Sequence, residues 1–529
     1  MPPAAAPLWR NDPALPLPYV LDEPPGEPRE GGVLRIGWHQ DLVSFDPTFS
    51  TSAGTLMLPN LVANRLLRFA GGVAFDPFER RLEPELARSW ERSPDGLTYT
   101  FHLTDEARWQ DAPPLDGRPL LAEDARWAIE RYAREGAHRG YLAAMARCEA
   151  LDEHTLSITL RRPQADFDLP LGSRSFCIYP RELHESGALE GMRGLAGSGP
   201  LILDAATPGE RLRLRRNPDY WEGAVHLDGL EVVIEPDPAR RLEGFRSGEF
   251  GYVSNPLERL SEAQALIGEL PETRLHLVPA FASQWGIALD LADARFADER
   301  VRQALMLAID REALAGELHE GLAKVLPSTP WIFAFDAEPE GEALGPWLRH
   351  DPAEAQRMLE AADALPLAFE LRYRNYHDVT NRRANERIAE QFAALGVTMT
   401  LREVDMTAFN RAWSGNDYGA AADGYAPAGF TTDAYFHDSL VTGGALNRWG
   451  ISDPQIDGWA ARQSGELDPE ARRELLRRIW DRVLERAYRI EKVGALRFEV
   501  YQPWLRNLRL YDATGDLGLQ IARVWLDRD

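Results

Sequence analysis

Turn residues and short apolar runs alternate in a fixed order through residues 197–252. The pattern predicts a β-hairpin around Pro208-Gly209, a further strand, and a helix with a side-chain cap and a glycine stop. In order, these elements are the runs Leu201–Leu203, Leu212–Leu214 and Leu230–Ile234, and a helix between Asp237 and Gly248. The segment therefore predicts a structural scaffold rather than a catalytic site.

The residues before this segment predict a mixture of strands and helices. Asp95-Gly96 precedes alternating apolar positions, which is typical of a tight hairpin. Leucine spacing predicts one helix over Leu56–Phe69. The predicted strands are Val33–Trp38, Leu97–Leu103 and Leu156–Leu160, and a second helix is predicted over Leu120–Tyr132.

The second half of the chain also alternates helices and strands. Apolar spacing predicts one continuous helix over Asp298–Leu318, with Asp298 as its cap. Asp468-Pro469 opens the last long helix, because aspartate caps and proline suits the first helical position. Other helices are predicted over Asp351–Ala362 and Asn385–Leu395. A strand is predicted to run from Leu275 past Pro279, and others at Leu367–Tyr373, Thr398–Val404 and Arg497–Tyr501. Two last strands are predicted near Leu508–Leu510 and Leu519–Val524.

Composition excludes several classes of protein. The chain has 529 residues, too many for one core. Its 83 acidic and 59 basic side chains give a net charge of −24. This charge would repel a phosphate backbone, so we expect no nucleic-acid partner. No run of about 18 apolar residues is present, so the sequence predicts no transmembrane helix.

The cysteines and the N-terminus leave alternatives open. Cys148 and Cys177 are the only cysteines, which excludes a cysteine-based metal site by number. A disulfide between them and two buried free thiols both fit the sequence. Residues 1–30 predict an extended tail, without a signal-peptide pattern or a cysteine for lipid attachment. A removed signal, a start codon assigned downstream and a cytoplasmic protein all fit this tail.

Signatures of catalysis and metal binding are missing from the sequence. There is no GxSxG elbow and no GxxxxGK[ST] phosphate loop, and Ala323 stands where an HExxH pair begun by His319-Glu320 would need its second histidine. His437 with His39 or His377 is the best metal candidate, but no two ligands stand at i, i+4. We therefore expect no catalytic residue, no metal site and no cofactor.

Four ordered blocks of this chain resemble the family 5 extracellular solute-binding proteins, the peptide, oligopeptide and nickel receptors of bacterial ABC importers. The blocks are GGVLRIGWHQDLVSFDP from Gly31, LEPELARSWERSPDGLTYTFHLTDEARW from Leu82, the segment 197–252, and DERVRQALMLAIDREALAGEL from Asp298. The resemblance runs from Gly31 to about Trp525.

The resemblance implies an α/β fold with two lobes, the periplasmic binding protein type II fold. It implies an inserted subdomain in the N-terminal lobe and a hinge between the lobes. After the tail at 1–30, lobe 1 would comprise residues 31–80, 196–281 and 495–529, with the inserted subdomain at 81–195 and lobe 2 at 282–494. The hinge crossings would lie near Ala282 and Gly494.

The resemblance also implies a ligand-binding cleft between the lobes. The residues expected to contact the ligand are Trp38, His39, Phe45, Ser283, Gln284, Trp285, Arg374, Gly424, Tyr425, Ala426 and Asp433. Arg374 could bind a carboxylate or another anion. In peptide receptors of this family, an acidic residue after the Gly-Trp segment pairs with the ligand's α-ammonium group. Here the matching position is Ala428, so that role would need Asp423 or Asp433.

The resemblance implies that the protein captures a solute and delivers it to an ABC permease, without a chemical step. Peptides are the leading class of solute. We expect a monomer in a periplasmic or extracellular, membrane-associated location. One alternative is a receptor for a ligand lacking an α-amino group, such as an oligosaccharide, an opine-like compound or a metal chelate. Another is a cytoplasmic solute sensor with the same fold.

Overall fold

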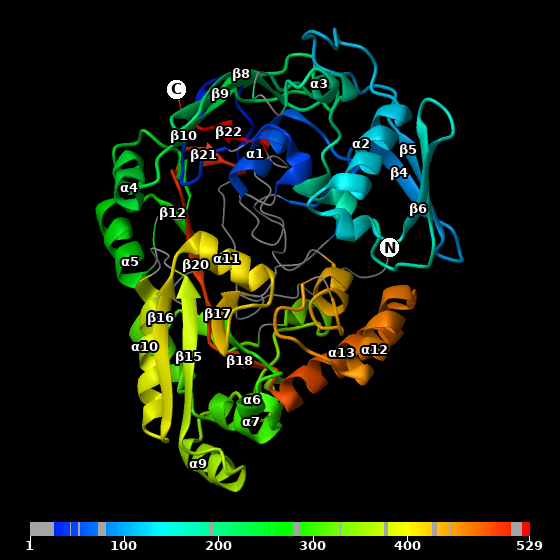
Figure 1. Cartoon of the computed structure of the whole chain (residues 1–529). Helices are drawn as coiled ribbons and strands as arrows, with labels where there is room; N and C mark the ends of the chain where they lie inside the picture. The colour runs from blue at the N-terminus through cyan, green and yellow to red at the C-terminus, as the bar shows by residue number, and fades with distance from the viewer. Residues whose placement is uncertain are drawn as a thin grey trace. The chain divides into compact units, whose positions relative to one another are not determined.

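A computed structural model of the chain divides into two compact units, whose elements Figure 1 shows in chain order. Unit 1 comprises Met1–Glu258, Glu262–Val278 and Arg497–Asp529, and unit 2 comprises Arg259–Ser261 and Pro279–Leu496. The structure describes residues 26–42, 44–50, 53–71, 81–189, 192, 194–254, 257, 259–278, 285–327, 329–374, 379–425, 431–444, 446–508 and 521–528. Most of the predicted tail, residues 1–25, therefore lies outside the described residues.

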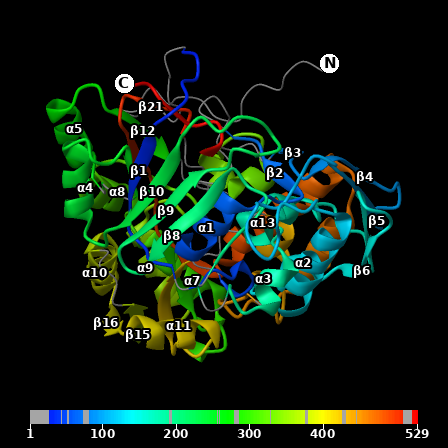
Figure 2. The same cartoon turned by 90° about the horizontal axis from the view of Figure 1, so that it is seen from above.

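Unit 1 contains a seven-stranded sheet with the order β12-β20-β11-β1-β10-β9-β8. Its strands are β1 (Val33–Trp38), β8 (Leu201–Thr207), β9 (Arg211–Arg216), β10 (Gly229–Ile234), β11 (Tyr252–Val253), β12 (Arg274–Val278) and β20 (Arg497–Tyr501). Strand β1 runs parallel to both β10 and β11, and the other neighbours are antiparallel. Figure 2 shows β8, β9, β10 and β1 side by side. The predicted β8–β9 hairpin and the strands β1 and β10 are confirmed.

One helix of unit 1 begins at a side-chain cap that the sequence predicts. The Asp237 carboxylate accepts the Ala239 N–H and opens α4 (Pro238–Arg246), as the sequence predicts. The other helices are α1 (Ala53–Val62), α2 (Ala122–Glu135), α3 (Arg181–Glu185) and α5 (Leu260–Glu269), with short 3₁₀ turns at Pro47–Phe49, Arg139–Leu142, Leu169–Gly172 and Arg174–Phe176.

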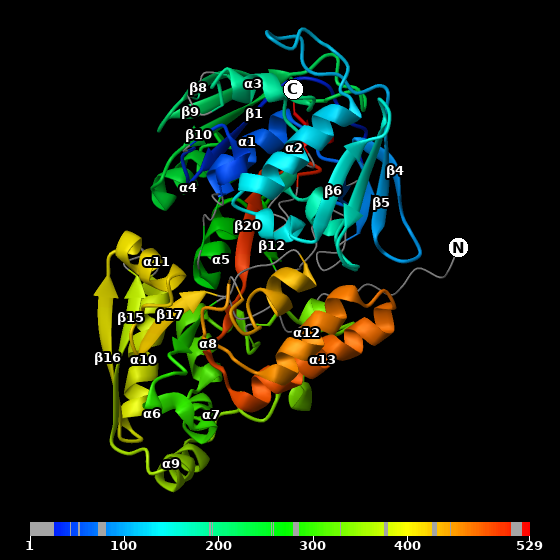
Figure 3. The same cartoon turned by 45° about the vertical axis from the view of Figure 1, so that its right-hand side comes forward.

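A separate four-stranded sheet lies within residues 81–195, in the order β4-β5-β7-β6. Its strands are β4 (Ala87–Arg92), β5 (Thr98–Leu103), β6 (Met145–Ala150) and β7 (Thr155–Leu160). The predicted hairpin around Asp95-Gly96 joins β4 to β5, and Gly96 has φ +70°, which favours glycine. Figure 3 shows α2 beside this sheet. The sheet belongs to unit 1, and its status as a distinct subdomain stays a prediction.

The Gly-Ser-Gly-Pro turn at 197–200 needs its glycines because the backbone passes close to the end of α1. A Cβ at Gly197 would lie 2.1 Å from the Val62 carbonyl oxygen. The Gly199 N–H donates to the same oxygen at 2.9 Å. The turn therefore fixes α1 against the start of β8.

The predicted helix over Leu56–Phe69 is wrong in its second half. Helix α1 ends at Val62, and Leu67–Phe69 forms β2, which pairs with β3 (Leu82–Pro84). The buried Glu85 carboxylate accepts the Arg65 backbone N–H at 3.1 Å and is paired with the Arg65 guanidinium at 2.9 Å. These bonds turn the chain out of the helix, and leucine spacing alone does not reveal them.

Unit 2 is built on a five-stranded sheet with the order β16-β15-β17-β13-β18. Its strands are β13 (Trp285–Leu289), β15 (Leu367–Arg374), β16 (Val397–Val404), β17 (Ala421–Tyr425) and β18 (Arg489–Glu491). Strands β16, β15 and β17 are parallel, and β13 runs antiparallel to both β17 and β18. The predicted strands at β15 and β16 are confirmed.

Helices cover both faces of this sheet. One core joins the sheet to α7 (Glu299–Leu307), α8 (Arg311–His319), α9 (Pro352–Ala361) and α10 (Val379–Ala393). A second core joins the opposite face to α11 (Met406–Ser414), α12 (Pro454–Gly465) and α13 (Pro469–Arg486). Unit 2 also contains α6 (Ala294–Ala297), the 3₁₀ turns Trp331–Phe333 and Gly341–Leu344, and one π turn, Asp433–His437.

The predicted single helix over Asp298–Leu318 is wrong, because it consists of α7 and α8. Asp298 caps α7 as predicted, but Asp310 caps a second helix by accepting the Ala313 N–H. The buried Arg311 guanidinium donates to the carbonyl oxygens of Met306 and Ile309, at the end of α7. The break therefore depends on a buried arginine in the middle of an apolar stripe.

The chain crosses between the units within a few residues of Ala282 and Gly494, the neighbourhoods that the sequence predicts. Strand β19 (Gly494–Ala495) pairs with β14 (Ala323–Lys324) inside unit 2, so the second boundary follows Leu496. Apart from the short piece Arg259–Ser261, the chain passes from unit 1 to unit 2 after Val278, a few residues before Ala282. A hinge at these crossings stays a prediction.

The predicted strands near the C-terminus are wrong in the part that the structure describes. The only strands after β20 in that part are β21 (Leu505–Arg506) and β22 (Trp525–Leu526), which pair with each other. Leu508 and residues 521–524 are not in strands, and 509–520 lie outside the described residues.

Both cysteines are buried free thiols, and burial raises the pKa of Cys148 to about 12.

Among the helices that the structure describes, none is long and apolar enough to cross a membrane.

Candidate ligand-binding site

Several predicted site residues of unit 2 meet at one edge of its sheet. Strands β15 and β17 are parallel and end there with Arg374 and Tyr425. The antiparallel β13 begins there, with Trp285 opposite Tyr425 and Gly286 opposite Gly424. The carboxyl ends of parallel strands are the usual ligand side of α/β sheets. We call these strand ends, together with the end of β18, the unit 2 edge.

Arg374 and Trp285 form a cation–π pair at this edge. The guanidinium carbon lies 4.6 Å from the centroid of the Trp285 ring, and both side chains are half-buried. Such stacking holds the guanidinium in one orientation against the indole ring.

Paired glycines leave room for large side chains beside the edge. A Cβ at Gly424 would lie 1.9 Å from the Trp413 ring, and one at Gly286 would lie 2.2 Å from Arg489 Nε. Arg489 also donates to the Gly424 carbonyl oxygen at 3.3 Å and lies over the Trp449 ring. Gly424 is therefore required for packing, a reason the sequence does not reveal.

Asp423 does not offer a free carboxylate, because the protein itself supplies its partners. The Lys492 ammonium donates to Asp423 Oδ1 at 2.6 Å. The side-chain amides of Asn381 and Asn385 donate to Oδ2 at 2.6 and 2.8 Å. Asp423 and Lys492 are 1% and 2% exposed. The network joins the start of α10 to β17 and β18.

Asp433 is also engaged inside unit 2. Its carboxylate accepts hydrogen bonds from Gln463 Nε2 at 2.7 Å and Ser464 Oγ at 2.6 Å, both on α12. The side chain is buried and holds the π turn against α12. The expectation that Asp423 or Asp433 serves as a free ligand carboxylate is therefore not supported in either case.

Sequence reasoning missed Lys492, Arg489 and Glu491, which lie on or directly after β18. Buried Arg489 and Glu491 form an ion pair at 3.8 Å. The sequence did contain a signal that could have pointed to Lys492, since it is one of only two lysines among the 59 basic residues. A compact ammonium with three donors suits a site with three oxygen acceptors better than a planar guanidinium does.

In unit 1, Trp38 and His39 stand at the carboxyl end of β1. The His39 backbone N–H donates to Ser254 Oγ at 3.0 Å, and its ring Nδ1 lies 2.8 Å from the same oxygen. Burial, then the charges of Arg241 and Arg497, lower the pKa of His39 to about 4, so the ring is neutral at pH 7.

Trp38 and Phe45 are both buried, which leaves little of either side chain accessible to a ligand. Trp38 is 7% exposed, and its Nε1 has no hydrogen-bond partner within the described part of the chain. A buried indole N–H without a partner is suited to donate a hydrogen bond to an acceptor atom of a ligand. Phe45 is 1% exposed and packs in the core of unit 1, so we leave it out of the proposed site.

Three predicted positions, and the side chain of a fourth, cannot be placed. Ser283, Gln284 and Ala426 lie outside the described residues, as does the side chain of Tyr425. The same holds for Ala428, the position of the expected acidic residue.

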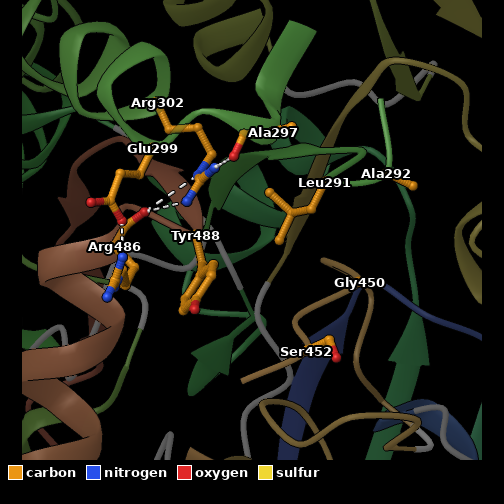
Figure 4. A pocket seen from close by; sticks show the side chains of 9 residues that line it. All are labelled: Leu291, Ala292, Ala297, Glu299, Arg302, Gly450, Ser452, Arg486 and Tyr488. Carbon is orange, nitrogen blue, oxygen red and sulfur yellow. Dashed lines mark hydrogen bonds and ion pairs between the residues drawn. The ribbon is translucent and has the colours of Figure 1, made fainter. Parts of the chain in front are cut away.

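A pocket of about 610 Å³ in unit 2 lies apart from the predicted residues (Figure 4). Its polar side chains are bound within the protein: Arg486 pairs with Glu299, Arg302 donates to the Ala297 carbonyl oxygen at 3.1 Å, and the Tyr488 hydroxyl donates to Asp453 at 2.8 Å. The lining residues are Leu291, Ala292, Ala297, Glu299, Arg302, Gly450, Ser452, Arg486 and Tyr488. We assign it no ligand.

No group of three or more histidine, cysteine or acidic side chains in the described ranges could hold a metal ion.

The fold defines the class of protein. Solved two-lobed periplasmic binding proteins share this fold over nearly their whole length. One is DppA of Helicobacter pylori in complex with the peptide STSA, with a TM-score of 0.76, 20% identity, and coverage of 94% of this chain and 99% of that one. Another is AgaA of A. tumefacien R10 in complex with agropinic acid, with a TM-score of 0.76, 21% identity and the same coverage.

The chain belongs to the bacterial extracellular solute-binding proteins, family 5, whose sequence model matches residues 81–447. Di/tripeptide-binding protein 1 of Pseudomonas aeruginosa is 28% identical over 344 residues, covering 60% of this chain and 61% of that protein. Heme-binding protein A of Haemophilus influenzae is 26% identical over 336 residues, covering 58% and 57%. The chain thus spans about three fifths of these relatives. The family is one of solute-binding proteins rather than enzymes.

Proposed function

We propose that this chain is the substrate-binding component of an ABC importer, which captures a peptide outside the cytoplasm and delivers it to a membrane permease. The observation that carries the proposal is the unit 2 edge, where Trp285, Arg374 and Gly424 meet in a chain of this family. Relatives named for di- and tripeptide binding support the peptide class. The protein would act as a monomer and need no cofactor.

A ligand without an α-amino group is the second candidate. It is favoured by the engagement of Asp423 with Lys492 and of Asp433 with α12. A structural neighbour was solved with agropinic acid, an example of a non-peptide ligand on this fold.

Peptide binding predicts a rise in melting temperature, because a ligand that binds only the native state stabilises it. A mixture of di- and tripeptides at about 100 times Kd should raise Tm on the order of 5 °C. The measurement is a fluorescence thermal scan, with the constituent free amino acids as the control. No rise with any peptide, together with a rise for oligosaccharides or opine-like acids, would overturn the peptide assignment.

A further inference from the structure

We infer that His39 donates a hydrogen bond from its ring Nε2 to an acceptor oxygen of the ligand, and that Ser254 holds the ring in the tautomer this requires. The acceptor is a carbonyl or carboxylate oxygen. This inference rests on the proposed solute-binding function and adds two residues of unit 1 to it. His39 is a specificity-determining residue, and Ser254 is a positioning residue that acts through it.

His39 directly follows β1, at the edge where parallel strands of unit 1 end. Strand β1 is parallel to both β10 and β11, so Trp38, Ile234 and Val253 end these strands at one edge of the sheet. The carboxyl ends of parallel strands are the usual ligand side of α/β sheets. Ser254 follows β11 at this edge and contacts His39.

Hydrogen bonds hold the backbone of Ser254 in place. Its N–H donates to the Gly37 carbonyl oxygen on β1 at 3.0 Å. Its own carbonyl oxygen accepts from Arg241 Nε on α4 at 3.0 Å. Ser254 and Arg241 are both 3% exposed. The Ser254 hydroxyl therefore has a defined place beside the start of His39.

The hydrogen bonds of Ser254 assign the ring proton of His39. Ser254 Oγ accepts the His39 backbone N–H at 3.0 Å and lies 2.8 Å from the ring Nδ1. A serine hydroxyl has one hydrogen to donate, and the described part of the chain offers it no acceptor other than Nδ1. Donation to Nδ1 satisfies the buried hydroxyl and leaves the proton of the neutral ring on Nε2.

The surroundings of His39 keep its ring neutral and its Nε2 unoccupied. Burial, then the charges of Arg241 and Arg497, lower the pKa of His39 to about 4. The side chain is half-buried, and Nε2 has no hydrogen-bond partner among the residues that the structure describes. The Nε2–H group can therefore donate to a ligand oxygen. The two arginine charges favour an oxygen that carries partial or full negative charge.

A second N–H donor lies beside His39. The Trp38 and His39 rings lie 5.4 Å apart, and the buried Trp38 Nε1 has no partner in the described ranges. Buried donors in folded proteins are nearly always paired. Two adjacent side chains with donors still unpaired therefore fit an edge that a ligand completes.

The first test observes the ring proton of His39. In nitrogen-15 NMR of the histidine-labelled full chain at pH 7, His39 is assigned by the signal lost in His39→Gln, and we expect a protonated Nε2 and an unprotonated Nδ1. Ser254→Ala should shift the proton towards Nδ1, because no hydroxyl then donates to that nitrogen. Ser247→Ala is the matched control and should change nothing, since the Ser247 hydroxyl donates to the Gly244 carbonyl oxygen at 3.0 Å. A proton on Nδ1 in the wild type would overturn the inference.

The second test measures the Kd of Ala-Ala-Ala by calorimetry on the full chain. His39→Phe should weaken binding about fivefold or more, as for loss of one hydrogen bond. His39→Gln should stay within about threefold of the wild type, because its amide can donate from the position of Nε2. His102→Phe, at a half-buried histidine on β5, is the matched control and should leave Kd unchanged.

Equal Kd values for the wild type and His39→Phe would overturn the inference and leave the proposed peptide function intact. If the wild type does not bind Ala-Ala-Ala, the proposed function and the inference fail together.

Discussion

Replacing Lys492 by methionine is expected to lower the free energy of unfolding of unit 2 by about 3–5 kcal/mol, because it leaves the Asp423 carboxylate buried without its counter-ion. Both partners are almost fully buried, and methionine has a similar length. The measurement is urea denaturation followed by tryptophan fluorescence. Because the chain forms two units, the transition belonging to unit 2 has to be resolved first.

Two further variants identify the cause of that loss. Arg382→Met removes an ion pair on α10 whose partners are 59% and 45% exposed, and it should change stability by less than about 1 kcal/mol. The double variant Lys492→Met with Asp423→Asn should recover part of the loss, because no unpaired charge remains. A loss below about 1 kcal/mol in Lys492→Met would contradict the buried network.

Replacing Arg131 by methionine is expected to destabilise unit 1 by about 3–5 kcal/mol. The Arg131 guanidinium donates to Asp46 Oδ1 and Oδ2 at 3.1 and 2.7 Å, and to Thr48 Oγ1 at 2.9 Å. The two charged partners are 1% and 2% exposed. Burial would lower the pKa of Arg131, but the hydrogen bond and charge of Asp46 raise it, so the guanidinium stays charged.

Arg134, three positions along α2, provides the matched control. It is 66% exposed and pairs only loosely with Glu135, at 3.3 Å. Arg134→Met should leave the unfolding midpoint almost unchanged, since exposed ion pairs contribute little. Equal effects of Arg131→Met and Arg134→Met would show that the Asp46 contact is not formed in solution.

Local patterns predict most elements of the fold because their signals are carried by neighbouring residues. The β1 strand, the turn at Asp95-Gly96 and the cap at Asp237 each depend on a few adjacent side chains. The two wrong helices depend on distant contacts instead. Arg65 is turned by Glu85, and Arg311 donates to the Glu491 carbonyl oxygen 180 residues away.

In the candidate site too, some residues could be predicted from the sequence, whereas contacts between residues distant in the chain could not. Trp285, Gly424 and Arg374 could be named because the sequence resembles a known family, and the sheet then brings the strand ends on which they stand together. The partner of Asp423 could not be predicted, since Lys492 lies 69 residues later along the chain. Its rarity in an arginine-rich sequence was the available clue.

Native mass spectrometry of the full chain, purified without denaturation, tests most directly whether this protein captures a solute. The account predicts a species heavier than the 59.4 kDa chain that loses its extra mass on denaturation, and a released ligand that is a peptide or another organic acid. Detection of the bare chain alone, even after incubation with di- and tripeptides and with opine-like acids, would contradict the account.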